Sequence, residues 1–236
     1  MAVAFGSGSA SDVRPVLGAV SCVLFDFDGP VCAVYGGRPA AGVTHELRRF
    51  ARMVGVPDSL LGGSRNDPLA VLRSCAAAGL GEHLLEAMHR YLTRLETRAV
   101  EVAPPTRGAG ELIGVLRRER YELAVVTNNS ALCVERYLAV HGLRGSFAAV
   151  HGRTRDPDLL KPHPDSVRRA LVSLGVAPRD ALFLGDSPAD VHAARAAGVP
   201  FLGYARNDRK LRALRESGAH LVVESLDVVT DALATK

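Results

Sequence analysis

The sequence predicts an α/β protein in which a doubly wound parallel sheet is interrupted by an all-helical insertion. Three observations support this: short apolar runs alternate with helical patterns, the strongest runs end in polar turns, and residues 33–103 show helical patterns only. Strands that alternate with helices are typical of parallel sheets covered on both faces. We therefore expect a core of residues 20–32 and 104–236, a helical cap of residues 33–103 and a flexible tail of residues 1–19.

The first stretch of the chain is rich in Gly, Ser and Ala and shows no period, which predicts the flexible tail. Residues 20–25 follow as a mostly apolar run that stops at Asp26, the pattern of a buried strand that ends in a polar turn. The further expected strands are residues 123–126, 147–150, 181–184, 200–204 and 220–223. The core helices are expected over residues 110–119, 132–141, 164–174, 189–196 and 209–217.

The insertion contains three helical patterns, over residues 44–54, 68–78 and 82–100. Its two connections to the core, residues 32–39 and 103–106, are rich in Gly and Pro. Such segments act as hinges where a helical region closes over a site as a lid.

Composition excludes several classes of protein. With 47% hydrophobic and 23% charged residues of both signs, the chain is expected to fold rather than stay disordered. The four cysteines form no zinc spacing and no disulfide framework, which favours the cytoplasm. No apolar run reaches the roughly 20 residues of a membrane span, so a membrane is not an expected partner. The basic residues are scattered among glutamates and the chain has no Trp, so a nucleic acid is not an expected partner either.

Four polar clusters fall at or near the carboxyl ends of expected strands. Ligands of an open parallel sheet bind outside these ends, so the clusters predict one shared site. Each cluster alone also has a simpler interpretation as a helix cap or a turn. The residues concerned are Asp26 and Asp28, Thr127 and Asn128, Lys161, and Asp186 and Asp190.

Together these residues supply the groups that the transfer of a phosphoryl group requires. Asp26 can attack phosphorus, while Asp28 can protonate the leaving oxygen and later deprotonate a water molecule. Thr127 and Lys161 can donate hydrogen bonds to the phosphoryl oxygens. Asp186 can complete an oxygen shell for Mg²⁺, which offsets the repulsion between the carboxylates and an anionic substrate.

The motifs Asp26-Phe27-Asp28-Gly29, Thr127-Asn128, Lys161-Pro162 and Gly185-Asp186-Ser187-Pro188-Ala189-Asp190 resemble the four motifs of the haloacid dehalogenase superfamily of hydrolases. The insertion resembles the small cap of the phosphoglycolate phosphatase-like branch. The resemblance implies a Rossmann-like core, Mg²⁺ and an aspartyl-phosphate intermediate. It also implies that Asp26, the backbone carbonyl of Asp28, and Asp186 hold the metal, that Asp190 supports them from behind, and that Asn128 binds substrate.

The expected activity is therefore Mg²⁺-dependent hydrolysis of a small phosphorylated metabolite, a phosphate monoester of the phosphoglycolate or sugar-phosphate type. Asp28 argues against a dehalogenase, since cleavage of a carbon–halogen bond needs no acid for an alcohol leaving group. Pro30 stands where most phosphatases of the family have Thr, and Ala33 and Val34 stand where Asp and Ser or Thr are usual. The turn after Asp28 thereby loses side-chain donors.

A glycine-marked loop over residues 60–67 resembles the cap loop of β-phosphoglucomutases, whose arginine contacts a substrate phosphate, and this makes Arg65 a candidate substrate-binding residue. In the alternative interpretation Asp67 caps a helix that starts at Pro68, and Arg65 is a surface charge. A β-phosphoglucomutase-like phosphotransferase is itself an alternative, but residues 34–38 lack the hinge histidine expected there. A receiver-type signalling domain would not need the insertion, and an inactive scaffold would typically lose a carboxylate. A hydrolase is favoured.

Overall fold

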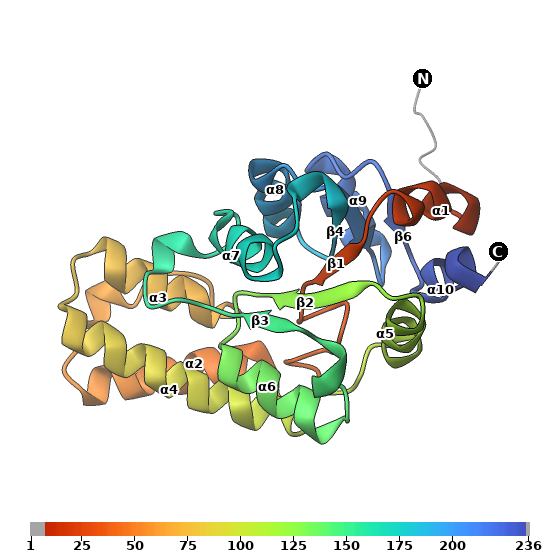
Figure 1. Cartoon of the computed structure of the whole chain (residues 1–236). Helices are drawn as coiled ribbons and strands as arrows, with labels where there is room; N and C mark the ends of the chain where they lie inside the picture. The colour runs from red at the N-terminus through yellow and green to blue at the C-terminus, as the bar shows by residue number, and fades with distance from the viewer. Residues whose placement is uncertain (1–7, 235–236) are drawn as a thin grey trace.

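The computed structural model describes residues 8–234 of the 236-residue chain. Its centre is a sheet of six parallel strands in the order β3-β2-β1-β4-β5-β6 (Figure 1). The order reverses between β1 and β4, which is the doubly wound arrangement that the sequence predicts. The strands are β1 Cys22–Phe25, β2 Glu122–Val126, β3 Ala149–His151, β4 Ala181–Gly185, β5 Phe201–Tyr204 and β6 Val222–Val223.

Helices cover both faces of the sheet (Figure 1). In β1, Val23 and Phe25 pack on one face with α5 and α6, while Cys22 and Leu24 pack on the other with α7 and α8. Burial on both faces explains why the central strands are continuous apolar runs rather than alternating ones. The core helices that the sequence predicts are α5 Ala109–Arg118, α6 Ala131–Val140, α7 Asp165–Leu174, α8 Pro188–Ala197 and α9 Asp208–Glu216.

The prediction of a flexible tail is wrong for residues 10–18, because these residues form helix α1 (Ala10–Gly18). The helix packs on another that was not expected, α10 (Asp227–Ala234), and it buries Val13 and Leu17 there. Val13 and Leu17 are one helical turn apart, too short a pattern to stand out in a Gly- and Ser-rich stretch. Residues 1–7 of the expected tail lie outside the described residues.

The insertion between β1 and β2 holds α2 (Ala40–Met53), a short 3₁₀ helix (Asp58–Leu60), α3 (Pro68–Ala77) and α4 (Glu82–Val100), so its three predicted helices are confirmed. These helices share an apolar core of their own, which includes Leu47, Leu72, Met88 and Leu92. The two connections to the sheet run side by side. Cys32 and Pro105 form an isolated antiparallel β-bridge, and the backbone amide of Ala33 donates to the carbonyl of Pro104 at 3.0 Å.

Two further features concern the cysteines and the lengths of the helices. All four cysteines are buried and free. Across residues 8–234, no helix combines the length and the apolar character that crossing a bilayer requires.

Candidate active site

Polar side chains from three neighbouring strands meet at one edge of the sheet. Asp26 follows β1, Thr127 follows β2 and Asp186 follows β4. The backbone amide of Asp26 donates to the carbonyl of Leu184 in β4 at 2.9 Å. This hydrogen bond between strands fixes the backbone position from which the Asp26 side chain extends. The side chains line a cavity of about 280 Å³, and Asp28 and Lys161 line it too. The structure thus brings residues of all four motifs together around one cavity, and their roles in a site stay predictions.

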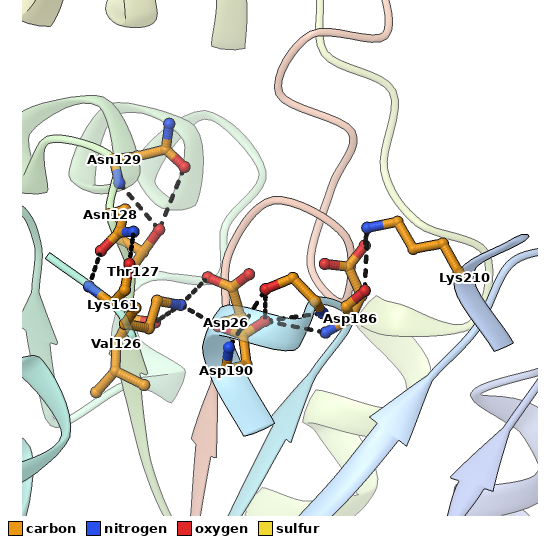
Figure 2. Close-up of polar contacts among 10 residues, drawn as sticks. Asp26, Val126, Thr127, Asn128, Asn129, Lys161, Asp186, Asp190 and Lys210 are labelled. Carbon is orange, nitrogen blue, oxygen red and sulfur yellow. Dashed lines mark hydrogen bonds and ion pairs between the residues drawn. The ribbon is translucent and has the colours of Figure 1, made fainter. Parts of the chain in front are cut away.

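Lys161 lies at the centre of this group (Figure 2). Its Nζ atom donates to Asp26 Oδ1 at 2.8 Å, to Asp190 Oδ1 at 2.5 Å and to the carbonyl of Val126 at 3.1 Å. The side chain is only 3% exposed. Burial opposes its charge, but Asp190 and Asp26 more than offset that effect and raise the pKa of Lys161, so the ammonium form is retained.

Asp190 is fully buried and its carboxylate is occupied by donors from the protein. Besides Lys161, it accepts from the amide of Asp186 at 3.2 Å and from the amide and hydroxyl of Ser187 at 3.0 and 2.6 Å. Ser187 and Asp190 form the capping box that starts α8. Asp190 therefore orients Lys161 and the Asp186 backbone.

Lys210, in the first turn of α9, contacts the Asp186 carboxylate, and its Nζ atom donates to the Asp186 carbonyl at 3.1 Å (Figure 2). The sequence interpretation did not assign a role to this residue. One signal was present: the chain has 29 basic residues but only three lysines, Lys161, Lys210 and Lys236. Two of the three line this one cavity.

Asn128 and Asn129 fix the loop after β2. Asn128 Oδ1 accepts from the backbone N of Lys161 at 2.8 Å, and Asn128 Nδ2 donates to the carbonyl of Lys161 at 3.0 Å. These two side-chain hydrogen bonds hold the Lys161 segment in place. Asn129 Oδ1 accepts from the Thr127 hydroxyl at 3.2 Å, and the amide of Asn129 donates back to Thr127 Oγ1 at 3.1 Å. Asn128 lines the cavity, and its role in substrate binding stays a prediction.

Arg65 is exposed and is not among the described residues that line the cavity, whereas its neighbours Asn66 and Asp67 are. Asp67 accepts from the amides of Leu69 and Ala70 at 2.9 and 3.0 Å. Asp67 is thus the N-cap of α3, as the alternative sequence interpretation held. A substrate contact for Arg65 stays a prediction.

The model of one protein family, described as haloacid dehalogenase-like hydrolase, matches residues 72–204 of the chain. The chain belongs to this family. The match contains Thr127, Lys161 and Asp186 and begins after Asp26, so the position of Asp26 rests on the geometry above.

The chain resembles two curated relatives over part of its length. It is 31% identical to a phosphoglycolate phosphatase of Escherichia coli K12 over 123 residues, which are 52% of this chain and 48% of that protein. It is 38% identical to a phosphoglycolate phosphatase of Haemophilus influenzae strain 86-028NP over 93 residues, 39% of this chain and 41% of that protein. The match therefore spans about half the length of each relative.

Solved structures share the fold of this chain. A predicted phosphatase from Clostridium acetobutylicum superimposes with a TM-score of 0.69 at 21% identity and covers 90% of this chain and 97% of its own. CbbY from Rhodobacter sphaeroides, in complex with phosphate, superimposes with a TM-score of 0.63 at 22% identity and covers 87% and 94%. At these identities the likeness establishes the fold alone.

The oxygen donors in the cavity fit a hard divalent cation. One carboxylate oxygen from each of Asp26, Asp186 and Asp190 lies within 4.8 Å of the other two. The Asp190 carboxylate already accepts hydrogen bonds from several protein donors. The carboxylates that remain available to Mg²⁺ are therefore those of Asp26 and Asp186. Mg²⁺ binds oxygen ligands and usually takes only one or two carboxylates. Gly29 leaves room for this arrangement, since a Cβ atom there would clash with the Asp186 carboxyl group.

Three aspartates that line the cavity have raised pKa values. Burial raises the pKa of Asp28 to about 6, against the opposing hydrogen bond from the amide of Val34 at 2.9 Å. Burial likewise raises the pKa of Asp186 to about 6, against the opposing charge of Lys210. Burial and Asp190 raise the pKa of Asp26, although Lys161 opposes them. A carboxyl with a pKa near 6 can both release and take up a proton near neutral pH.

Proposed function

We propose that this protein is a Mg²⁺-dependent phosphatase that hydrolyses a small phosphate monoester of the phosphoglycolate or sugar-phosphate type. The observation that carries the proposal is that Asp26 ends the central strand with Lys161 Nζ 2.8 Å from its carboxylate and with the carboxylate of Asp186 close by. Phosphoryl transfer is catalysed mainly by positioning and by positive charge around the transferred group. A carboxylate nucleophile between an ammonium group and a cation site suits that chemistry.

In the first step, a carboxylate oxygen of Asp26 attacks phosphorus while the bond between phosphorus and the ester oxygen breaks. Asp28 donates its proton to the departing oxygen, which leaves as an alcohol. The raised pKa of Asp28 keeps this proton available near neutral pH. The hydroxyl of Thr127 and the ammonium of Lys161 donate hydrogen bonds to the phosphoryl oxygens.

In the second step, water hydrolyses the aspartyl phosphate. Asp28, now a carboxylate, takes a proton from the water molecule as its oxygen attacks phosphorus. The bond between phosphorus and Asp26 breaks, inorganic phosphate leaves, and both carboxyl groups return to their starting forms. Mg²⁺ held by Asp26, Asp186 and the backbone carbonyl of Asp28 would offset the negative charge of the carboxylates and the phosphoryl group.

Residues 33–103 act in this proposal as a cap that selects the substrate. Asn66, Asp67 and Leu69 belong to the insertion, and they line the same cavity as Asp26. The leaving group of the ester would face them, because the phosphoryl group is held by core residues. Substrate choice and chemistry would then be carried by different parts of the chain.

The test is a phosphate-release screen with phosphoglycolate, several sugar phosphates and p-nitrophenyl phosphate, each with Mg²⁺ and with excess chelator. We expect release that requires Mg²⁺ and that the variant Asp26→Asn lacks. Transfer of the phosphoryl group to a second sugar would identify a phosphotransferase instead. Release at the same rate in wild type and Asp26→Asn would overturn the proposal.

A further inference from the structure

Glu96 is a fully buried carboxylate that the proposed reaction does not use. It lies in the last third of α4, within the insertion, and four donors surround it. Its Oε1 atom accepts from Arg153 Nη1 at 2.8 Å and from Asn129 Nδ2 at 3.1 Å. Its Oε2 atom accepts from Arg153 Nη2 and from the amide of Ser130, both at 3.1 Å.

Arg153 is as deeply buried as its partner, with a side chain only 2% exposed. Removing two charges from water carries a large desolvation cost, which is offset only where the geometry is good and every hydrogen-bonding group is satisfied. Here the contact is bidentate, and both carboxylate oxygens receive two donors. Such a pair holds its partners in place more than it adds net stability.

The contacts of this pair lead to the loop that follows β2. Arg153 Nη1 donates to the carbonyl of Asn128 at 3.1 Å, and the amide of Arg153 donates to the carbonyl of Asn129 at 2.8 Å. Asn129 in turn accepts from the Thr127 hydroxyl at 3.2 Å. Each of residues 127–130 is therefore linked to Glu96 or Arg153, directly or through one neighbour.

The pair also joins segments that are distant in the sequence. Glu96 belongs to the insertion, while Arg153 follows β3 in the core. Next to Glu96 along the chain, Ala99 and Val100 pack into the core cluster that contains α6, and α4 runs beside α6 (Figure 1). The carboxyl end of α4 is thus fixed to the loop that carries Thr127.

We propose that Glu96 and Arg153 are positioning residues that hold residues 127–130 in the conformation that binds the phosphoryl group. The inference rests on the proposed function for its catalytic readout, because Thr127 acts there on the phosphoryl oxygens. Neither Glu96 nor Arg153 is among the described residues that line the cavity, so the pair acts through Asn128 and Asn129.

The variant Glu96→Gln tests this with almost no change in shape. Its side-chain amide replaces an acceptor with two hydrogens where four donors already point, so at least one donor loses its acceptor. We expect kcat/KM for phosphate release to fall at least tenfold at a temperature where the variant is folded. We also expect hydrogen exchange of the amides of residues 128–130 to rise at least tenfold.

The matched control is Thr93→Val on the same helix. It removes only the hydroxyl that Arg153 Nη2 reaches at 3.4 Å, and it leaves Glu96 and the loop untouched. Both readouts should match those of wild type. If Glu96→Gln does not fold, Asn129→Ala replaces it, because that variant breaks the link to Thr127 and keeps the buried charge pair.

A folded Glu96→Gln, or Asn129→Ala in its place, with wild-type exchange would overturn the proposal. Wild-type kcat/KM in the same variant would overturn it as well, since a purely structural role would lower stability alone. If wild-type protein releases no phosphate from any ester, the proposed function fails on its own, and hydrogen exchange then decides whether Glu96 holds the loop.

Discussion

The ammonium group of Lys210 rests against the carboxylate of Asp186, the side chain proposed to hold Mg²⁺. Lys210 is one-fifth exposed and comes from α9, so it can leave this position without unfolding the sheet. The Lys210 ammonium group and Mg²⁺ would bind the same carboxylate oxygens of Asp186. We therefore expect Lys210 to compete with Mg²⁺ for Asp186.

Removing this competition should strengthen metal binding. In Lys210→Met we expect the Kd for Mg²⁺, measured by titration calorimetry without phosphate, to fall about tenfold, which corresponds to about 1.4 kcal/mol. The control is Arg209→Met, which removes an exposed charge from the same helical turn. An unchanged or weaker affinity in Lys210→Met would show that Lys210 supports the site instead.

Asp26→Asn should abolish turnover while keeping the fold. The change is isosteric, and Lys161 keeps its contacts with Asp190 and the Val126 carbonyl, but an amide is a poor nucleophile. We expect phosphate release to fall by about three orders of magnitude or more, with a thermal unfolding midpoint close to that of wild type. Asp208→Asn, at an exposed aspartate, should leave both values unchanged. Wild-type turnover in Asp26→Asn would exclude Asp26 as the nucleophile.

The raised pKa of Asp28 makes stability depend on pH. The pKa of the group is about 6 in the folded chain, against an ordinary value of 3.8 for an aspartate in water, so the group destabilises the fold where it is ionised. Its contribution is therefore more favourable below pH 6 and is lost as the pH rises through 6.

Comparing wild type with Asp28→Asn isolates this effect, because Asn cannot titrate. In urea unfolding with excess chelator, wild type should gain about 1 kcal/mol relative to Asp28→Asn between pH 8 and pH 5. A difference in stability that stays constant over this range would mean that the pKa of Asp28 is ordinary.

Arg65 is expected to contact substrate although it lies outside the cavity lining, which requires the loop before α3 to move toward the core. Arg65→Ala should then raise KM for the preferred ester about tenfold, the loss of one charge-assisted hydrogen bond of roughly 1.5 kcal/mol. Hydrolysis of p-nitrophenyl phosphate should stay nearly unchanged. Asn66→Ala, at a residue that already lines the cavity, serves for comparison. Equal KM values for Arg65→Ala and wild type would make Arg65 an ordinary surface residue.

Leu17 tests the unexpected terminal helix. Its side chain is 2% exposed in the core cluster that also contains α10 residues, so Leu17→Ala should lower the free energy of unfolding by about 2 kcal/mol or more. Val172→Ala shortens a side chain that is 83% exposed and should change stability little. Equal stabilities of Leu17→Ala and wild type would show that α1 does not contribute to the folded core.

The sequence could predict which residues meet in the site because parallel strands bring their carboxyl ends to one edge. Asp26, Thr127 and Asp186 each follow directly from that rule. Lys210 could not be placed by it, since it reaches the site from a helix beside the sheet. The pairing of Glu96 with Arg153 was equally out of reach, because the two residues are far apart in the chain and each resembles an ordinary surface charge in sequence.

The backbone β-bridge between Cys32 and Pro105 places the start and the end of the insertion next to each other. A unit attached in this way can be exchanged as a cassette: residues 33–103 could be replaced by another segment with adjacent ends, and the strand order would be unaffected. One requirement on such a replacement concerns Arg153. The replacement would have to present an acceptor to Arg153 where Glu96 now lies, because among residues 8–234 Arg153 forms no ion pair other than the one with Glu96.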